Sequence, residues 1–181
     1  GAGGVGSIAI QLAKKLARLD VIASASRPDS IAWVKTLGAD AAVDHTRPLP
    51  EQMLALGAPE TEYILCCNNT DAVFPALPRL IAPQGHVCSI VRTTKPVDLS
   101  LLQEKSVTFA WEGMFTRSTF QTPDLQAQHH LLEDAAGLLE AGALVTTLRE
   151  NLGRICAANL KQAHQRIEQG HMIGKLVLEG F

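Results

Sequence analysis

The first residues of the chain form a pattern that can bind a phosphate. Gly1, Gly3 and Gly6 satisfy the spacing G-x-G-x-x-G within GAGGVGSIAIQLAKKL. In dinucleotide-binding units this loop joins a buried strand to a helix, whose N-terminal N–H groups face a pyrophosphate. Glycines are common in turns, so the pattern alone also fits an ordinary start of a helix. The apolar helical spacing after it favours the phosphate loop, with predicted pyrophosphate contacts at Ala2, Gly3, Gly4, Val5, Gly6 and Ser7.

The residues after the next strand bear on which dinucleotide is bound. That strand ends in Ser26 and Arg27, without the carboxylate that accepts both ribose hydroxyls of NAD. Asp29 follows Pro28 and falls inside the next helix. Because a hydroxyl and a guanidinium suit a 2′-phosphate, the sequence predicts NADP(H), with Ser26 and Arg27 as its ligands. A solvated surface charge is the alternative reading of Arg27.

Helix and strand patterns alternate around these residues. Hydrophobic spacing predicts helices at 7–19, 28–37, 71–81, 99–105, 121–141 and 157–169, and strands at 20–26, 41–45, 63–67, 86–91, 106–111, 147–152 and 173–178. Such alternation is typical of a parallel sheet with helices on both faces. The predicted fold is α/β, a doubly wound parallel sheet (Rossmann) of order 3-2-1-4-5-6. Its first strand is lacking in this chain, and a C-terminal strand–helix–strand return follows the sheet.

Charge and hydropathy exclude several classes of partner. The net charge is −2, the isoelectric point is about 6.3 and there is no basic run, so we expect no nucleic acid and no membrane surface as partner. No window reaches the roughly 18 continuous apolar residues of a membrane span, and residues 1–20 lack a signal-peptide pattern. We therefore expect a cytoplasmic protein.

The four cysteines predict no metal site. They form no C-x-x-C pair, and adjacent Cys66 and Cys67 on one extended segment point to opposite faces. We interpret them as reduced thiols of the core or of a site lining.

Five segments in order resemble the medium-chain dehydrogenase/reductase superfamily, in its zinc-type alcohol dehydrogenase-like and quinone oxidoreductase branch. They are GAGGVGSIAIQLAKKL, LGADAAVDH, IAPQGHVCSI, WEGMFTRSTFQTPD and the closing GKLVLEGF. The resemblance implies an NADP-binding domain over residues 1–143. It also implies that residues 144–181 join an N-terminal catalytic (GroES-like) domain, which this sequence does not contain.

The resemblance also assigns residues around the nicotinamide. In the family, the loops after strands four and five flank this ring, which maps onto Cys67, Asn68 and Asn69 and onto Ser89, Ile90 and Val91. The two asparagines could instead cap the following helix. Lys175 matches the closing motif of the family and equally fits a surface lysine.

The activity implied by the resemblance is hydride transfer between NADPH and a small-molecule carbonyl, enone or quinone. No residue is an evident catalytic proton donor, and zinc is not expected in this chain. Two alternatives remain open, a non-catalytic NADPH-sensing module and an enoyl reductase module of a larger synthase. The resemblance also suggests a homodimer through strand 106–111.

The position of the first glycine predicts that residues 1–181 are a fragment of a longer polypeptide. The first strand of such a sheet is central and buried, and a single large buried side chain contributes roughly 1.5 to 3 kcal/mol. Without that strand we expect marginal folding, or filling of the slot by another chain.

Overall fold

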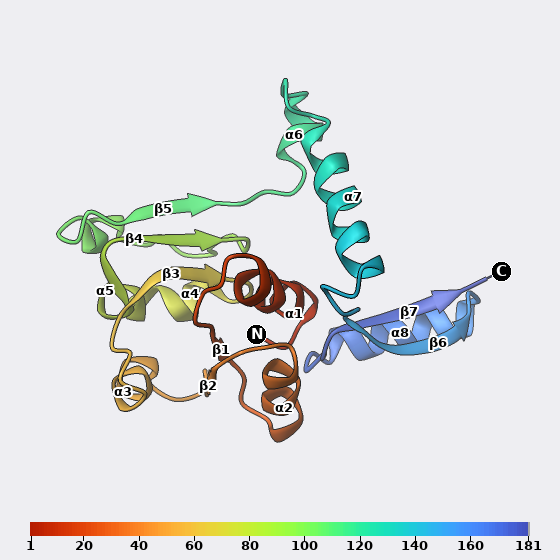
Figure 1. Cartoon of the computed structure of the whole chain (residues 1–181), viewed down its shortest axis with the longest axis horizontal. Helices are drawn as coiled ribbons and strands as arrows, with labels where there is room; N and C mark the ends of the chain where they lie inside the picture. Colours follow the sequence, from red (N-terminus) through yellow and green to blue (C-terminus); the bar gives the residue numbers. More distant parts are fainter. Residues whose placement is uncertain (181) are drawn as a thin grey trace. The chain divides into compact units, whose positions relative to one another are not determined.

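The computed structural model describes residues 1–180, whose strands pair only in parallel (Figure 1). Two strands form a first sheet, β1 (Ile22–Ser24) and β2 (Ala41–Val43). Three form a second sheet, β3 (Thr61–Cys66), β4 (Ile81–Ser89) and β5 (Thr108–Trp111). The last two, β6 (Leu148–Arg154) and β7 (Lys175–Glu179), form a third. The predicted α/β fold with parallel sheets is confirmed.

Helices connect the strands. They are α1 (Gly4–Gln11), α2 (Pro28–Thr36), α3 (Leu49–Ala55), α4 (Thr70–Val73), α5 (Leu77–Leu80), α6 (Thr116–Phe120), α7 (Ala127–Glu140) and α8 (Ala157–Glu168). A π-helical turn at Leu12–Leu16 follows α1, and 3₁₀ turns occupy Phe74–Ala76 and Leu99–Leu102. No helix within residues 1–180 combines the length and the apolar character that crossing a membrane requires.

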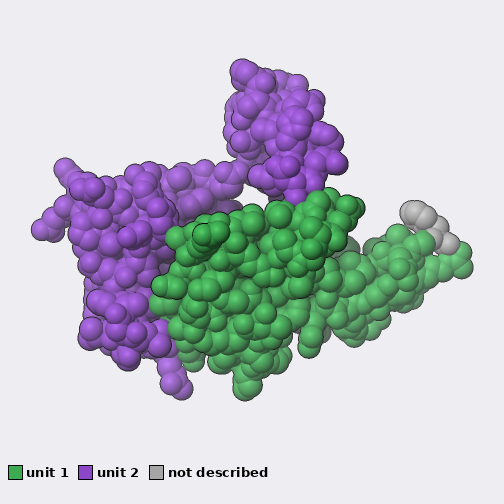
Figure 2. Space-filling view, viewed as in Figure 1, with its two compact units in different colours: residues 1–45, 135–181 green, residues 46–134 purple. Residues whose placement is uncertain are grey.

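The chain divides into two compact units (Figure 2). Unit 1 combines residues 1–45 with the residues from 135 onward, and unit 2 is residues 46–134. Unit 1 is therefore built from both ends of the sequence. The predicted division at residue 143 remains a prediction, because it depends on an N-terminal catalytic domain that only the resemblance implies.

The core of unit 1 lies between the first sheet and its helices. Ala23 of β1 and the adjoining Ala25 are buried, and they cluster with Ile10 of α1 and Val34 of α2. Small side chains on the strand let the helices approach it closely. The glycine loop is thus held against a packed surface by the helix that follows it.

The core of unit 2 lies on one face of the three-stranded sheet. Cys66 and Val87 point into a buried cluster with Phe74 and Leu77 from the helical segment between β3 and β4. Side chains alternate between the two faces of β3, so Tyr63 lies on the exposed face. Its ring stacks on that of His86 of β4, with ring centroids 5.6 Å apart.

Several element boundaries differ from the predicted ones. The predicted helix 7–19 begins earlier, because the Ser7 N–H already donates to the Gly3 carbonyl, 2.8 Å away. It ends in the π-helical turn, after which Arg18 adopts a left-handed φ of 57°. The predicted helix 121–141 begins only at Ala127, because Gln121 is left-handed and ends α6.

Helix α3 was not predicted from the sequence. Pro48 and Pro50 resemble loop residues there, yet they occupy the N-cap and the first turn of the helix, where proline lacks only an N–H that would be unpaired anyway. The predicted helix 71–81 is broken as its prolines suggest, into α4, a 3₁₀ turn and α5.

Candidate cofactor-binding site

The glycine loop forms an open N-terminus for α1. Gly3 is the N-cap, and the first N–H groups of the helix, at Gly4, Val5 and Gly6, have no acceptor within it. A Cβ at Gly6 would overlap the carbonyl of Gly1, so only glycine allows this close turn. A Cβ at Gly3 would meet no atom within 4 Å, because this position faces open space. The loop can therefore receive a group that approaches its backbone at Gly3.

Ser7 holds the loop from inside. It is fully buried, its Oγ donates to the Ala2 carbonyl at 3.0 Å, and the Trp33 Nε1–H donates to that Oγ at 2.8 Å. The Arg149 guanidinium lies over the Trp33 ring, 5.5 Å from its centroid. Ser7 thus has a structural role that the sequence analysis missed, and its predicted contact with pyrophosphate stays a prediction.

The segment that precedes β7 runs beside the loop. The Gly174 N–H donates to the Ala2 carbonyl at 2.8 Å, and Gly3 and Gly174 form a parallel bridge. Gly174 has a φ of 60°, and a Cβ there would overlap the Thr147 carbonyl. The Lys175 side chain lies against Gly4, where an added Cβ would be 2.9 Å from Nζ. A cation therefore stands at the N-terminus of α1.

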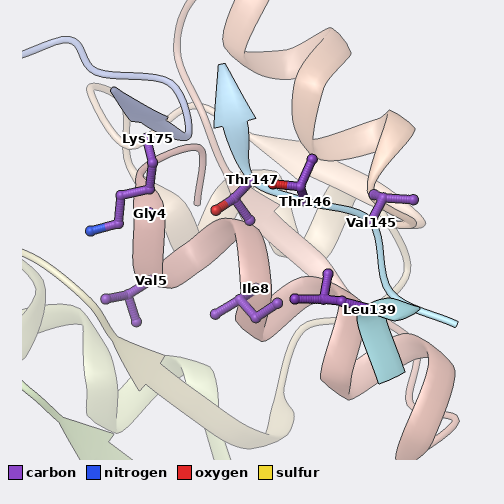
Figure 3. Close-up of a pocket in the computed structure, with 8 residues that line it drawn as sticks. All are labelled: Gly4, Val5, Ile8, Leu139, Val145, Thr146, Thr147 and Lys175. Atoms are coloured by element: carbon purple, nitrogen blue, oxygen red, sulfur yellow. The ribbon is translucent and has the colours of Figure 1, made fainter. Parts of the chain in front are cut away.

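A cavity of about 330 Å³ opens beside this cation (Figure 3). Its walls are mostly apolar, with polar groups from two threonines and the lysine. The lining residues are Gly4, Val5, Ile8, Leu139, Val145, Thr146, Thr147 and Lys175.

Gln11 of α1 fixes one wall of this cavity. Its side chain is fully buried, Oε1 accepts from the Val145 N–H at 2.8 Å, and Nε2 donates to the Val145 carbonyl at 3.0 Å. Local sequence patterns do not predict this contact of Gln11, because its partner Val145 is far away in the sequence.

Arg27 lies in unit 1 at the carboxyl side of β1. It is the N-cap of α2, and Ser30 fixes its backbone, with the Arg27 N–H donating to Ser30 Oγ at 3.1 Å. The guanidinium contacts the C-terminal part of the chain, because Nη2 donates to the His171 carbonyl at 2.7 Å and Nη1 to its Nδ1 at 3.0 Å. Ser26, the other predicted ligand, is half-buried directly before it.

A carboxylate also lies near Arg27. Asp29 Oδ1 is 3.4 Å from Arg27 Nε and accepts from the Ser30 N–H at 2.7 Å. The predicted absence of an acid holds for the strand end itself, but Asp29 brings a negative charge close to the guanidinium from the first turn of α2.

The predicted nicotinamide contacts lie at the carboxyl ends of β3 and β4 in unit 2. Asn68 is exposed and Cys67 is half-buried after β3, while Ser89 is buried and Ile90 half-buried at the end of β4. The Ser89 Oγ is hydrogen bonded to Thr70 Oγ1, 2.7 Å away. These contacts remain predictions.

Two further details of unit 2 bear on the asparagines. Asn69 caps α4, because its Oδ1 accepts from the Ala72 N–H at 3.1 Å. The capping alternative is therefore confirmed for Asn69. Asn68 makes no such cap and leaves its side chain exposed.

The cysteines do not form a reactive or metal-binding centre in the described residues. Burial raises the pKa of the Cys66 thiol to about 11, and burial also raises the pKa of Cys67 and of Cys88. These thiols stay protonated at neutral pH, so they are poor nucleophiles and poor ligands. Residues 1–180 contain no group of three or more His, Cys, Asp or Glu side chains placed to hold a metal ion.

Comparison with known proteins identifies the family. The family model described as zinc-binding dehydrogenase matches residues 37–178. The chain belongs to the zinc-binding dehydrogenase family. A zinc-type alcohol dehydrogenase-like protein of Staphylococcus aureus (strain MSSA476) is 42% identical over 178 residues, which are 98% of this chain and 53% of that protein. The chain thus spans about half the length of the curated relatives it matches.

Solved structures agree on the fold. A candidate zinc-dependent alcohol dehydrogenase protein from Rhizobium etli CFN 42 matches 99% of this chain and 52% of its own, with a TM-score of 0.93 and 46% identity. The mycobacterial protein Rv1454c, solved in complex with NADPH, matches 99% of this chain and 54% of its own, with a TM-score of 0.80 and 22% identity. The resemblance to the medium-chain family is confirmed, and the chain corresponds to the cofactor-binding portion of the family's oxidoreductases.

Proposed function

We propose that this chain binds NADP(H) and serves an oxidoreductase that transfers hydride between NADPH and a small-molecule carbonyl, enone or quinone. The observation that carries the proposal is the Arg27 guanidinium at the carboxyl side of β1, where an NAD-binding protein would place a carboxylate on the strand end. Its positive charge and its outward N–H groups suit a phosphate.

The glycine loop and Lys175 support a pyrophosphate at the N-terminus of α1. The free N–H groups and the helix dipole favour an anion there, and Lys175 adds a full positive charge beside Gly4. Gly3 leaves the space through which phosphate oxygens would approach. Ala2 contributes as the anchor of the loop, since its carbonyl accepts from both Ser7 Oγ and the Gly174 N–H.

The cavity beside the loop supports an amphipathic ligand. Val5 and Ile8 offer an apolar wall next to the Lys175 cation, which suits a ligand with both apolar and anionic parts. When bound, the nicotinamide supplies the hydride, and the residues of this chain bind and orient the cofactor. Cys67, Asn68, Ser89 and Ile90 are the proposed contacts of the ring in unit 2.

The test is a comparison of cofactor affinities. Arg27→Ala should weaken NADPH binding about tenfold or more, since a hydrogen bond to a charged group is lost, and should leave NADH binding nearly unchanged. Calorimetric titration measures both dissociation constants. Equal losses for the two cofactors would remove the assignment of Arg27 to the 2′-phosphate. Oxidation of NADPH on addition of carbonyls, enones or quinones then separates a reductase from a module that only senses NADPH.

A second candidate is NAD(H), and the position of Asp29 favours it. Its carboxylate is 60% exposed beside Arg27, where it could accept ribose hydroxyls. If NADP(H) is the cofactor, Asp29→Asn should raise the preference for NADPH, because a charge that repels the 2′-phosphate is removed. If NAD(H) is the cofactor, the same change should weaken NADH binding instead.

We propose a second copy of the chain as partner, through β5. This strand is at the edge of its sheet within unit 2, and Trp111 at its end is 51% exposed. An exposed strand edge with apolar side chains is a template for pairing.

A further inference from the structure

The turn at residues 170–175 contacts both proposed phosphate sites of unit 1. At its end, Gly174 donates to the Ala2 carbonyl and Lys175 lies against Gly4, at the pyrophosphate end of the cofactor. At its start, His171 contacts Arg27, at the 2′-phosphate end. One short segment before β7 therefore links the two sites.

His171 holds the guanidinium of Arg27 at two points. The distance from Nη1 to His171 Nδ1 is 3.0 Å, and the distance from Nη2 to the His171 carbonyl oxygen is 2.7 Å. A guanidinium has donors only, so Nδ1 is the acceptor and the proton of the neutral imidazole is on Nε2. These contacts use the N–H of each Nη that lies next to the other Nη, so the second N–H of each points outward, to opposite sides of the guanidinium.

The rest of Arg27 is fixed as well. Its Nε lies 3.4 Å from Asp29 Oδ1, its N–H donates to Ser30 Oγ, and its carbonyl accepts from that same hydroxyl at 2.9 Å. With the backbone held by α2 and the plane of the fork held by His171, little conformational freedom of this long side chain is left to lose when a ligand binds.

We propose that His171 is a positioning residue that sets the preference for the phosphorylated cofactor. Its Nδ1 and its carbonyl hold the plane of the guanidinium so that an outward N–H of one Nη binds the 2′-phosphate. The inference rests on the proposed function, because it assumes that Arg27 is the ligand of that phosphate. The imidazole acts through Arg27 and does not itself bind the cofactor.

The backbone of His171 determines which variants test this role. Its φ is 64°, in the left-handed region that glycine and asparagine adopt most readily. His171→Gly and His171→Asn therefore both suit the turn and both keep the carbonyl contact. Asparagine places its Oδ1 acceptor near the position of the histidine Nδ1, whereas glycine has no acceptor. The two variants therefore differ in whether an acceptor faces Arg27 Nη1.

The experiment measures dissociation constants of NADP and NAD by calorimetry for the full chain, the two His171 variants, Arg27→Ala, and the double variant Arg27→Ala/His171→Gly. His171→Gly should lower the NADP:NAD affinity ratio about three- to tenfold, through NADP alone. His171→Asn should keep the ratio within about twofold of the original. In the Arg27→Ala background, His171→Gly should not change the ratio further.

Four results would overturn the inference. An equal loss of both cofactors would show that His171 only supports the turn. An undiminished effect in the Arg27→Ala background would show that it does not act through Arg27. A gain in NADP affinity in His171→Gly would mean that the histidine competes with the phosphate. If His171→Asn does not keep the NADP:NAD affinity ratio, the role of Nδ1 as acceptor is excluded. If Arg27→Ala leaves the ratio unchanged, the cofactor assignment falls too, which separates the failure of the proposed function from that of His171 alone.

Discussion

Gly3 and Gly6 belong to one motif but occupy different surroundings. A methyl group at Gly6 would collide with the Gly1 backbone carbonyl, whereas a methyl group at Gly3 would face open space. We predict that Gly6→Ala costs about 1–3 kcal/mol of unfolding free energy, because the backbone must shift, and that Gly3→Ala leaves stability nearly unchanged. Chemical denaturation measures both.

Gly3→Ala also tests cofactor binding separately from stability. In Gly3→Ala the added methyl group occupies the space by which phosphate would approach the loop, so NADPH affinity should fall while the fold is retained. Unchanged affinity in Gly3→Ala would show that the cofactor does not approach the backbone there.

Asp40 predicts a pH dependence of stability. Its carboxylate accepts from Lys14 Nζ at 2.7 and 2.8 Å and from the Val21 N–H at 2.7 Å. The Lys14 hydrogen bond, followed by the one from Val21, lowers the pKa of Asp40. A carboxyl whose pKa is lower in the folded state stabilises above its ordinary pKa of about 3.9, and this contribution is lost as the pH falls through the folded value.

We therefore predict that Asp40→Asn lowers the melting temperature at neutral pH. The difference from the original chain should shrink as the pH falls below about 3.9 and disappear once the pH is below the lowered pKa of folded Asp40. Thermal melts across this range make the comparison. Asp20→Asn is the matched control, since Asp20 is 3.3 Å from the same lysine but its side chain is 96% exposed. A difference that persists at low pH would mean that the asparagine acts by something other than the lost charge.

At the scale of elements, β5 carries the prediction for assembly. Thr108 and Ala110 are exposed on this edge strand. Replacing both with lysine places two like charges on each copy at the proposed interface, so a dimer should shift toward monomer in sedimentation. The variant Leu54→Lys/Gln103→Lys adds the same charge at exposed positions outside β5 and should leave the distribution as it was. A dimer that withstands the β5 lysines would exclude this edge.

Most elements were predictable from local patterns, because a period of two or of 3.6 and the glycine and proline positions act within one segment. Proline and glycine correctly bound α2, for example, since Pro28 begins it and Gly38 follows it with a φ of 109°. The wrongly predicted boundaries and the missed helix arise from backbone features that hydrophobic spacing does not encode. The π-helical turn after α1 and the left-handed Gln121 leave no trace in hydrophobic spacing, and the prolines of α3 suit a loop as well as a helix start.

The candidate site was predictable to a smaller extent. The glycine loop and Arg27 could be proposed from the sequence because each motif is contiguous in it. Lys175, His171 and Gly174 reach the same region from the other end of the chain, and only the folded structure shows which of them contacts the loop. Ser7 and Trp33 were missed as partners for the same reason.

At the scale of the whole molecule, Gln11 ties the two ends of the sequence together in unit 1. Gln11→Met keeps the volume of the side chain but leaves the Val145 N–H and carbonyl without their partners. We predict a loss of about 1–3 kcal/mol in unfolding free energy, measured by urea denaturation. The exposed Gln103→Met should change it by less than about 0.5 kcal/mol. Equal changes in unfolding free energy for Gln11→Met and Gln103→Met would mean that water replaces the hydrogen bonds of the Val145 N–H and carbonyl.

The indole of Trp33 has an optical consequence. It donates to the buried Ser7 hydroxyl behind the glycine loop and carries the Arg149 cation on its face, so its emission wavelength depends on the electric field at that spot. Trp111 is the other tryptophan of the sequence, exposed at the end of β5 in unit 2, and Trp111→Phe would leave a single emitter. Unit 1 thus contains its own spectroscopic label, placed one hydrogen bond from the loop, by which occupancy can be followed without attaching a dye.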